Sequence, residues 1–134
     1  MRLNKYQYAW IRRLKSGKTR KCKNELNDGK GSFCCLGVGI NSCKLEKISS
    51  RTIFDRSECL DGHEYPQTYD KLNLKSEDGK FDWDKVSDKW KDILKEKGIS
   101  KQQNFLIYLN DDTNMSHKTI GQFIDENREA VFKG

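Results

Sequence analysis

Residues 27–40 read Asn-Asp-Gly-Lys-Gly-Ser-Phe-Cys-Cys-Leu-Gly-Val-Gly-Ile, a turn followed by a compact apolar run. The two glycines of the turn favour a chain reversal, because glycine adopts positive φ at no steric cost. Within the apolar run the spacing of a helix competes with that of a strand. We favour a helix that begins at Cys34 or Cys35, with Ser32 near its cap.

The apolar run is small, rich in sulfur and broken by Gly37 and Gly39. Small residues let another backbone or a ligand approach closely. Cys and Gly are also among the residues most often buried in proteins. Burial is therefore the favoured role of Cys34 and Cys35, and direct contact with a ligand is the alternative.

The composition fits one folded domain without a membrane segment. The chain has 134 residues, of which 34% are hydrophobic and 34% are charged, and it includes three Trp, five Tyr and six Phe. This length is typical of a single domain, and so many aromatic side chains argue against disorder. No apolar run approaches the ~20 residues of a membrane helix, and the first residues lack the hydrophobic run of a signal peptide. We expect one domain over residues 1–134 that contacts no membrane.

Positive charge is concentrated near the N-terminus. The net charge is +6, yet residues 1–23 hold nine Lys or Arg and no acid, which leaves 17 basic and 20 acidic residues in the rest of the chain. A patch of this kind attracts a phosphate-bearing partner by Coulomb forces, although a solvated helix face gives the same pattern.

Local signals place the first elements. Asn4 is a suitable cap for a helix over about residues 5–16, and Gly17 is a suitable C-terminal stop. An extended segment is expected over 18–26. Residues 45–80 are the least legible part of the chain.

The second half is predicted from apolar spacing and from caps. Short strands are suggested at 51–54 and 71–74, and helical spacing predicts a helix over 83–97. A capping-box pattern opens a short helix over 100–109, and Ser116 caps a last helix. The expected fold is α+β, a mainly helical single domain with a small β-hairpin or sheet. Its predicted core comprises Trp10, Leu14, Leu36, Trp90, Ile93, Phe105, Ile120 and Phe123.

Few residues carry a catalytic signal. His63 and His117 lie in no catalytic motif, and we expect both at the surface. Cys34 or Cys35 at a helix N-terminus near basic residues would have a lowered thiol pKa, which leaves a small cysteine-dependent enzyme as one alternative. Catalysis would also need an oriented base, which the sequence does not reveal. We expect no catalytic residue.

Metal binding has weak support. Five cysteines in a chain without a secretion signal are interpreted as reduced thiols. Cys59 and His63 are spaced like half of a zinc site, but no second pair matches them. Residues 110–114 are rich in oxygen but lack the Gly and Glu of an EF-hand, so a helix-terminating loop is favoured. We expect no metal and no cofactor.

The strongest physical signal is for binding. Basic side chains next to aromatic ones suit contacts with phosphates and stacking on bases. Lys18 and Arg20 are expected to lie beside the N-terminus of the helix that begins near Cys34, where unpaired N–H groups favour anions. A phosphate would be held there, with Trp10 or Tyr8 near a base. The predicted ligand-binding residues are Lys18, Arg20, Trp10, Tyr8, Arg13, Cys34 and Cys35.

Two blocks of sequence carry a resemblance to a known family. The first runs from a helix with Trp10 and Gly17 to the Phe-Cys-Cys-Leu-Gly-Val block at 33–38, and the second is Tyr-Leu-Asn-Asp at 108–111. Together they resemble a large family of small proteins encoded by tailed bacteriophages and prophages. The chain differs from the usual pattern at Gly39, where a larger apolar residue is common, and through most of residues 45–80.

The resemblance implies a phage accessory protein that acts against host defence, in the cytoplasm of the infected bacterium. By analogy with other phage proteins, the expected function is to bind and sequester a nucleotide-derived signal, such as a cyclic oligonucleotide or cyclic ADP-ribose, without cleaving it. The expected partner is thus a small phosphate-bearing nucleotide, and the chain is expected to form a homo-oligomer. The alternative is an inhibitor that binds a host defence protein or nucleic acid directly.

Overall fold

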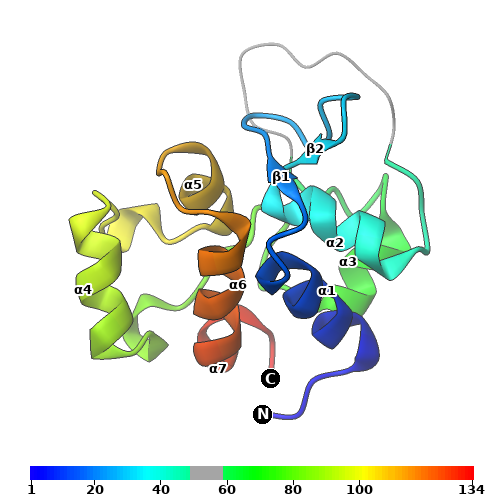
Figure 1. Ribbon diagram of the computed structural model, residues 1–134. Coiled ribbons are helices and arrows are strands. Elements are labelled where there is room, and N and C mark those ends of the chain that lie inside the picture. The colour runs from blue at the N-terminus through cyan, green and yellow to red at the C-terminus, as the bar shows by residue number, and fades with distance from the viewer. Residues whose placement is uncertain (49–58) are drawn as a thin grey trace.

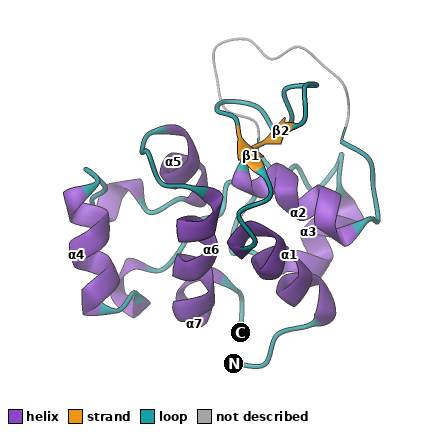
Figure 2. Ribbon diagram, viewed as in Figure 1, coloured by secondary structure: helices purple, strands orange, loops and turns teal. Residues whose placement is uncertain are grey.

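The computed structural model describes residues 1–48 and 59–134 and is mainly helical, with one two-stranded sheet (Figures 1 and 2). The predicted mainly helical α+β domain is confirmed. Among the described residues, no helix has the length and apolarity needed to cross a bilayer. In chain order the elements are α1 Lys5–Lys15, β1 Arg20–Lys21, β2 Ser32–Phe33, α2 Cys35–Cys43, α3 Pro66–Leu72, the 3₁₀ helix η1 Trp83–Lys85, α4 Asp88–Glu96, the 3₁₀ helix η2 Lys101–Gln103, α5 Leu106–Asp111, α6 His117–Glu126 and α7 Arg128–Val131.

Helix α1 follows its local signals closely. The Asn4 side chain accepts hydrogen bonds from the backbone N–H groups of Tyr6 and Gln7, and the Gln7 side chain accepts one from the Asn4 N–H. This reciprocal capping box satisfies donors that a helix start leaves unpaired. Gly17 ends the helix at φ +70°, a conformation that favours glycine.

The sheet differs from a hairpin. Strands β1 and β2 pair in parallel, with Arg20 opposite Ser32 and Lys21 opposite Phe33. The intervening segment doubles back on itself, because Asn27 also pairs with Phe33 in an antiparallel bridge. Two strand segments therefore run in the same direction above the start of α2.

Helix α2 begins at Cys35 as predicted, but its cap is Cys34 and not Ser32. The Cys34 sulfur accepts a hydrogen bond from the Gly37 N–H at 3.3 Å. Gly37 also permits a close approach, since a Cβ atom there would lie 2.0 Å from the backbone O of Leu26. The glycine thus brings the turn segment directly against α2.

Three predictions for the second half need correction. The short helix expected over 100–109 is divided into η2 and α5, with Asn104 and Phe105 outside both. The first two residues of the segment proposed as a strand at 71–74 belong to α3, Asn73 caps that helix, and Leu74 forms an isolated bridge with Phe132. The helix expected over 83–97 is divided into η1 and α4, because Ser87 caps a new helix within it. The strand suggested at 51–54 lies outside the described residues.

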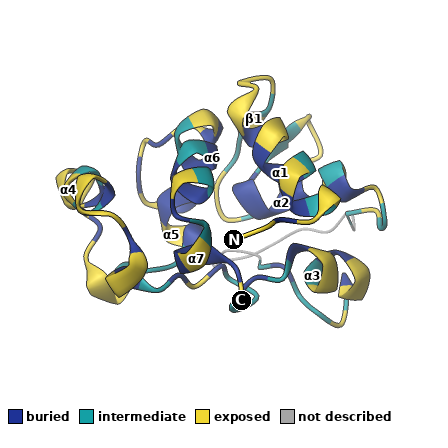
Figure 3. Cartoon of the chain, turned by 90° about the horizontal axis from the view of Figure 1, so that it is seen from below, coloured by how far each residue is buried: buried dark blue, intermediate teal, exposed yellow. Residues whose placement is uncertain are grey.

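The core lies where α1 packs against α6 and α2, and it continues to α4 through aromatic contacts (Figure 3). Trp10 and Phe132 meet edge to face at a centroid distance of 6.1 Å, and Trp90 meets Phe123 at 5.5 Å. Six of the eight predicted core residues are buried. Ile93 and Phe105 are half-buried instead.

Candidate functional site

Three of the predicted ligand-binding residues belong to the core. Trp10 is 0% exposed, Cys34 2% and Cys35 0%. The Trp10 indole N–H donates to the Cys35 carbonyl at 2.9 Å, so its ring is fixed inside the protein and cannot stack on a base. The prediction that these three side chains contact a ligand is therefore wrong, and their role is packing.

The expected phosphate position at the start of α2 is also closed. The Cys35 N–H donates to Asn110 Oδ1 at 3.0 Å, and Asn110 Nδ2 donates to the Cys22 carbonyl at 2.8 Å. Asn110 is itself 0% exposed. A buried side chain thus takes the place that an anion would have occupied at this helix N-terminus. The Cys-Cys block and the Leu-Asn-Asp block are in contact through these bonds.

The remaining basic residues of the prediction are exposed but do not converge on one point. The Arg20 guanidinium donates to the Lys30 carbonyl at 2.9 Å, which directs it along the turn. Arg13 is exposed in the last turn of α1, and Lys18 is exposed beyond the end of that helix. The predicted convergence of Lys18, Arg20 and a helix N-terminus on one phosphate is therefore wrong. Tyr8, which is also in the predicted set, lines a cavity.

The cysteine thiols are poorly suited to nucleophilic chemistry. Burial raises the pKa of the Cys35 thiol to about 12, and it raises the pKa of the Cys34 thiol as well. Because the thiolate is the reactive form, both groups are held in their unreactive state at neutral pH. The lowered pKa expected at the helix N-terminus is not found.

The cavity that contains Tyr8 is an open groove of about 460 Å³. Helix α1 and the residue that follows it form one side, and the end of α6 and the start of α7 form the other. Positions 8, 12 and 15 recur at helical spacing, so their side chains share one face of α1. Among the described residues, the lining consists of Tyr8, Ile11, Arg12, Lys15, Ser16, Asp125 and Arg128. We call this cavity the Tyr8 groove.

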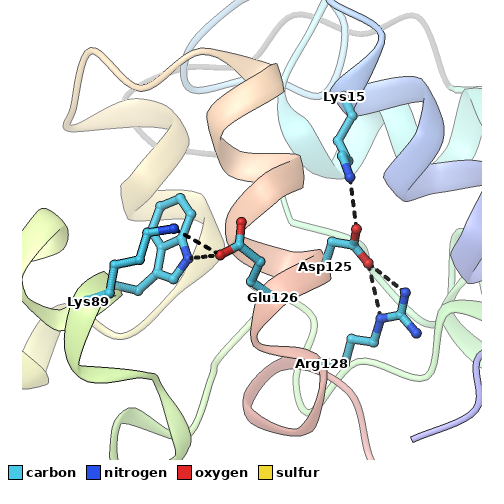
Figure 4. Close-up of polar contacts among 6 residues, drawn as sticks. Lys15, Lys89, Asp125, Glu126 and Arg128 are labelled. Carbon is cyan, nitrogen blue, oxygen red and sulfur yellow. Dashed lines mark hydrogen bonds and ion pairs between the residues drawn. The ribbon is translucent and has the colours of Figure 1, made fainter.

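Asp125 organises the charges of the groove (Figure 4). Its carboxylate accepts a hydrogen bond from Lys15 Nζ at 2.8 Å, and two from Arg128, at 2.6 Å from Nη2 and 3.1 Å from Nε. These bonds hold the pKa of Asp125 below its usual range. The neighbouring Glu126 points to the other side, where it binds Lys89 and Trp90 of α4. Asp125 thus binds the cations of the groove, whereas the adjacent Glu126 joins α6 to α4.

The groove keeps an excess of positive charge beside an accessible aromatic ring. Three cations and one carboxylate line it, and Arg12 has no ion-pair partner in the part of the chain that the structure describes. The Arg128 guanidinium lies 5.3 Å from the centroid of the Tyr8 ring, and Tyr8 is 40% exposed. A cation fixed against an aromatic face is a suitable surface for a planar, negatively charged ligand.

The family model described as Domain of unknown function (DUF8296) matches residues 3–128, which include every residue of the Tyr8 groove. The chain belongs to this family. No curated protein and no solved structure matches it. The family description names no activity, so the function has to be argued from the chemistry of the site.

His117 is a polar residue whose position the sequence did not reveal. It is 3% exposed at the start of α6, and its Nδ1 lies 2.6 Å from Thr19 Oγ1. Its Nε2 is buried without a hydrogen-bond partner among the described residues. Burial lowers the pKa of His117 to about 4, and the nearby Lys21 acts in the same direction. The expected surface position is correct for His63 and wrong for His117.

Acidification is expected to destabilise the fold through His117. Its ordinary pKa is 6.5, whereas the folded chain keeps it neutral down to about pH 4. The unfolded chain therefore takes up this proton first, so the stabilisation is complete above pH 6.5 and is lost as the pH falls towards 4. About 2 kcal/mol should be lost between about pH 7 and pH 5, measured by urea unfolding.

A pair of variants isolates this effect. His117→Gln should flatten the dependence of unfolding free energy on pH over that interval, and His63→Gln should keep the slope of the parent. An unchanged slope in His117→Gln would show that other groups cause the acid sensitivity.

The described residues provide no group of three or more His, Cys, Asp or Glu side chains arranged to hold a metal ion. Within the oxygen-rich run 110–114, the first two residues are part of α5, and Asn110 and Asp111 are buried. Asp111 Oδ1 accepts hydrogen bonds from Asn110 Nδ2 and from the Asn24 N–H. These side chains support the turn segment through bonds to backbone groups 75 to 88 positions away, whereas bonds to local backbone groups were expected.

Proposed function

We propose that the chain binds a small phosphate-bearing molecule of nucleotide type in the Tyr8 groove and retains it without chemical change. One observation carries the proposal: Arg12, Lys15 and Arg128 surround the groove beside the exposed ring of Tyr8, against a single carboxylate. The cations suit phosphate oxygens, and the ring with its stacked guanidinium suits a base.

The size of the groove agrees with a ligand of this class. Small-molecule sites are commonly concave regions of about 300–1,000 Å³, and the Tyr8 groove measures about 460 Å³. Phosphate would compete with Asp125 for Lys15 and Arg128, whereas Arg12 forms no ion pair with any residue that the structure describes. Arg12 is therefore the residue on which we expect the phosphate to depend most.

The biological setting that we propose follows from the resemblance to phage and prophage proteins. A chain that binds a nucleotide and has poorly reactive thiols suits an accessory protein that removes a defence signal by sequestration. Cyclic oligonucleotides and cyclic ADP-ribose are the proposed ligands, in the cytoplasm of an infected bacterium. A homo-oligomer is part of this proposal.

The proposal is tested by a thermal-shift screen of cyclic dinucleotides, cyclic trinucleotides and ADP-ribose derivatives. A ligand at about 100 times its Kd stabilises the native state by about 2.7 kcal/mol, because it binds the folded chain selectively. In a chain of this size the Tm should rise by about 5–10 °C. The Tyr8→Ala/Arg12→Gln variant should lose most of the shift.

The Lys18→Ala/Arg20→Ala variant is the matched control, since it removes two positive charges outside the groove. It should keep most of the shift seen with the parent. The sequestration proposal is wrong if no nucleotide stabilises the parent while duplex DNA or a host protein binds it tightly. The alternative, an inhibitor that binds a host protein or nucleic acid directly, would then be favoured. Duplex binding of that kind would weaken steeply with salt.

A further inference from the structure

A second cavity, of about 510 Å³, lies among residues 75–104 and shares no residue with the Tyr8 groove. Three lysines from three separate segments line it: Lys75 after α3, Lys80 before η1 and Lys101 in η2. The sequence does not mark these three lysines as a group. The chain beyond residue 23 has more acidic than basic residues, so no local excess of positive charge points to them. The fold brings the three together.

The walls of this cavity are joined by backbone and side-chain hydrogen bonds. The Phe81 N–H donates to the Asn104 carbonyl at 2.8 Å, and Asn104 Nδ2 donates to the Phe81 carbonyl at 2.6 Å. The Asp82 N–H donates to the Ala130 carbonyl at 2.9 Å. Phe81 is fully buried and Trp83 is 8% exposed, so the floor is rigid and apolar. A cavity built this way exists before a ligand arrives.

The lysines of the cavity are available for a ligand. Neither Lys75 nor Lys80 forms an ion pair within the described ranges 1–48 and 59–134. Lys101 Nζ lies 3.8 Å from Asp84 Oδ1, but both side chains are more than 60% exposed, and exposed pairs of this kind contribute little. Asp82 is the one acidic residue in the described lining. Its carboxylate accepts a hydrogen bond from the backbone N–H of Asp84.

We propose that this cavity is a second binding site, independent of the Tyr8 groove, for a compact polyanion that carries at least two phosphate or carboxylate groups. Lys75, Lys80 and Lys101 would each hold an anionic group from a different side. Asn104 lies at the wall beside them, and the Trp83 ring would contact the remainder of the ligand. Amine donors from three separate segments suit a ligand with several separated charges. A single planar carboxylate is better matched by the fork-shaped guanidinium of an arginine.

The test uses inorganic triphosphate and citrate as probes and follows amide and indole resonances of the ¹⁵N-labelled full chain. We expect saturable shifts of the Trp83 indole and the Asn104 side-chain amide with at least one probe. Lys80→Gln/Lys101→Gln should weaken binding about tenfold or more, because two charge-assisted hydrogen bonds to the ligand are lost. The control Lys95→Gln/Lys118→Gln removes the same charge from exposed sites outside the cavity and should change the affinity about twofold or less.

Protection from acetylation gives a second readout that needs no variant. An amine-acetylating reagent should modify Lys75, Lys80 and Lys101 more slowly when triphosphate is present, with Lys95 unaffected. The proposal is overturned if neither probe shifts Trp83 and Asn104, or if the control variant weakens binding as much as Lys80→Gln/Lys101→Gln. Shifts confined to Tyr8 and Arg12 would also overturn it and would leave the proposed function standing.

Discussion

The Gly37→Ala variant is expected to unfold at a much lower urea concentration than the parent. Its Cβ would lie 2.0 Å from the backbone O of Leu26 and 2.9 Å from the backbone C of Leu26. A backbone cannot move aside as a side-chain end can, and the same Leu26 O accepts the Cys34 N–H. Overpacking costs about 1–3 kcal/mol and sometimes more, against the ~1 kcal/mol that Ala gains over Gly in a helix. A 2.0 Å approach to backbone atoms belongs at the upper end of this cost, so we expect a net loss of about 2 kcal/mol.

Gly39→Ala is the matched control, two residues further along the same helix. There a Cβ would meet Leu72 Cδ1 at 2.8 Å and Trp10 Nε1 at 3.3 Å, which are side-chain atoms. Leu72 can rotate by a small amount, so the loss should be about 1 kcal/mol or less. Equal unfolding midpoints for the Gly37→Ala variant and the parent, or a larger loss for Gly39→Ala, would contradict the close contact between the turn and α2.

The Asn110→Ala variant is expected to lose about 4 kcal/mol, because it removes the hydrogen-bond partner of the buried Cys35 N–H and of the part-buried Cys22 carbonyl. Each such group costs about 1–3 kcal/mol when its hydrogen bond is removed. Asn110 is fully buried, so water cannot replace its amide without a rearrangement of α5. Urea unfolding measures the loss.

Asp112→Ala tests whether position 110 is special within this segment. Asp112 is exposed and lies two residues further on, and its replacement should change stability by less than about 0.5 kcal/mol. If the two variants lost the same amount, the network around Asn110 would not be what joins α5 to α2.

The parts of the fold that were predictable are those that depend on neighbouring residues. The cap at Asn4 and the cap at Ser116 each use a side chain within three residues of the N–H groups they satisfy. Apolar spacing likewise placed Trp10 and Leu14 in the core. The parallel pairing of β1 with β2 was not predictable, because strand register depends on contacts across the turn that no local pattern records.

The candidate site was only partly predictable for a related reason. Tyr8 was identified from its place in a basic, aromatic segment, but Asp125 and Arg128 are more than 100 positions away. Their i, i+3 spacing predicts an ion pair on a helix and gives no indication of the α1 face that it contacts. Trp10, Cys34 and Cys35 were assigned to the ligand because the sequence could not show that all three are buried or that the Trp10 indole N–H donates to the Cys35 carbonyl.

Mass spectrometry of small molecules released by heat tests the central claim most directly. The parent and the Tyr8→Ala/Arg12→Gln variant would be purified at low temperature from bacteria whose nucleotide-based defence is active. Sequestration without cleavage predicts an intact nucleotide-derived signal in near-stoichiometric amount from the parent and little from the variant. Recovery of no phosphate-bearing molecule from the parent, or of equal amounts from both proteins, would contradict binding in the Tyr8 groove.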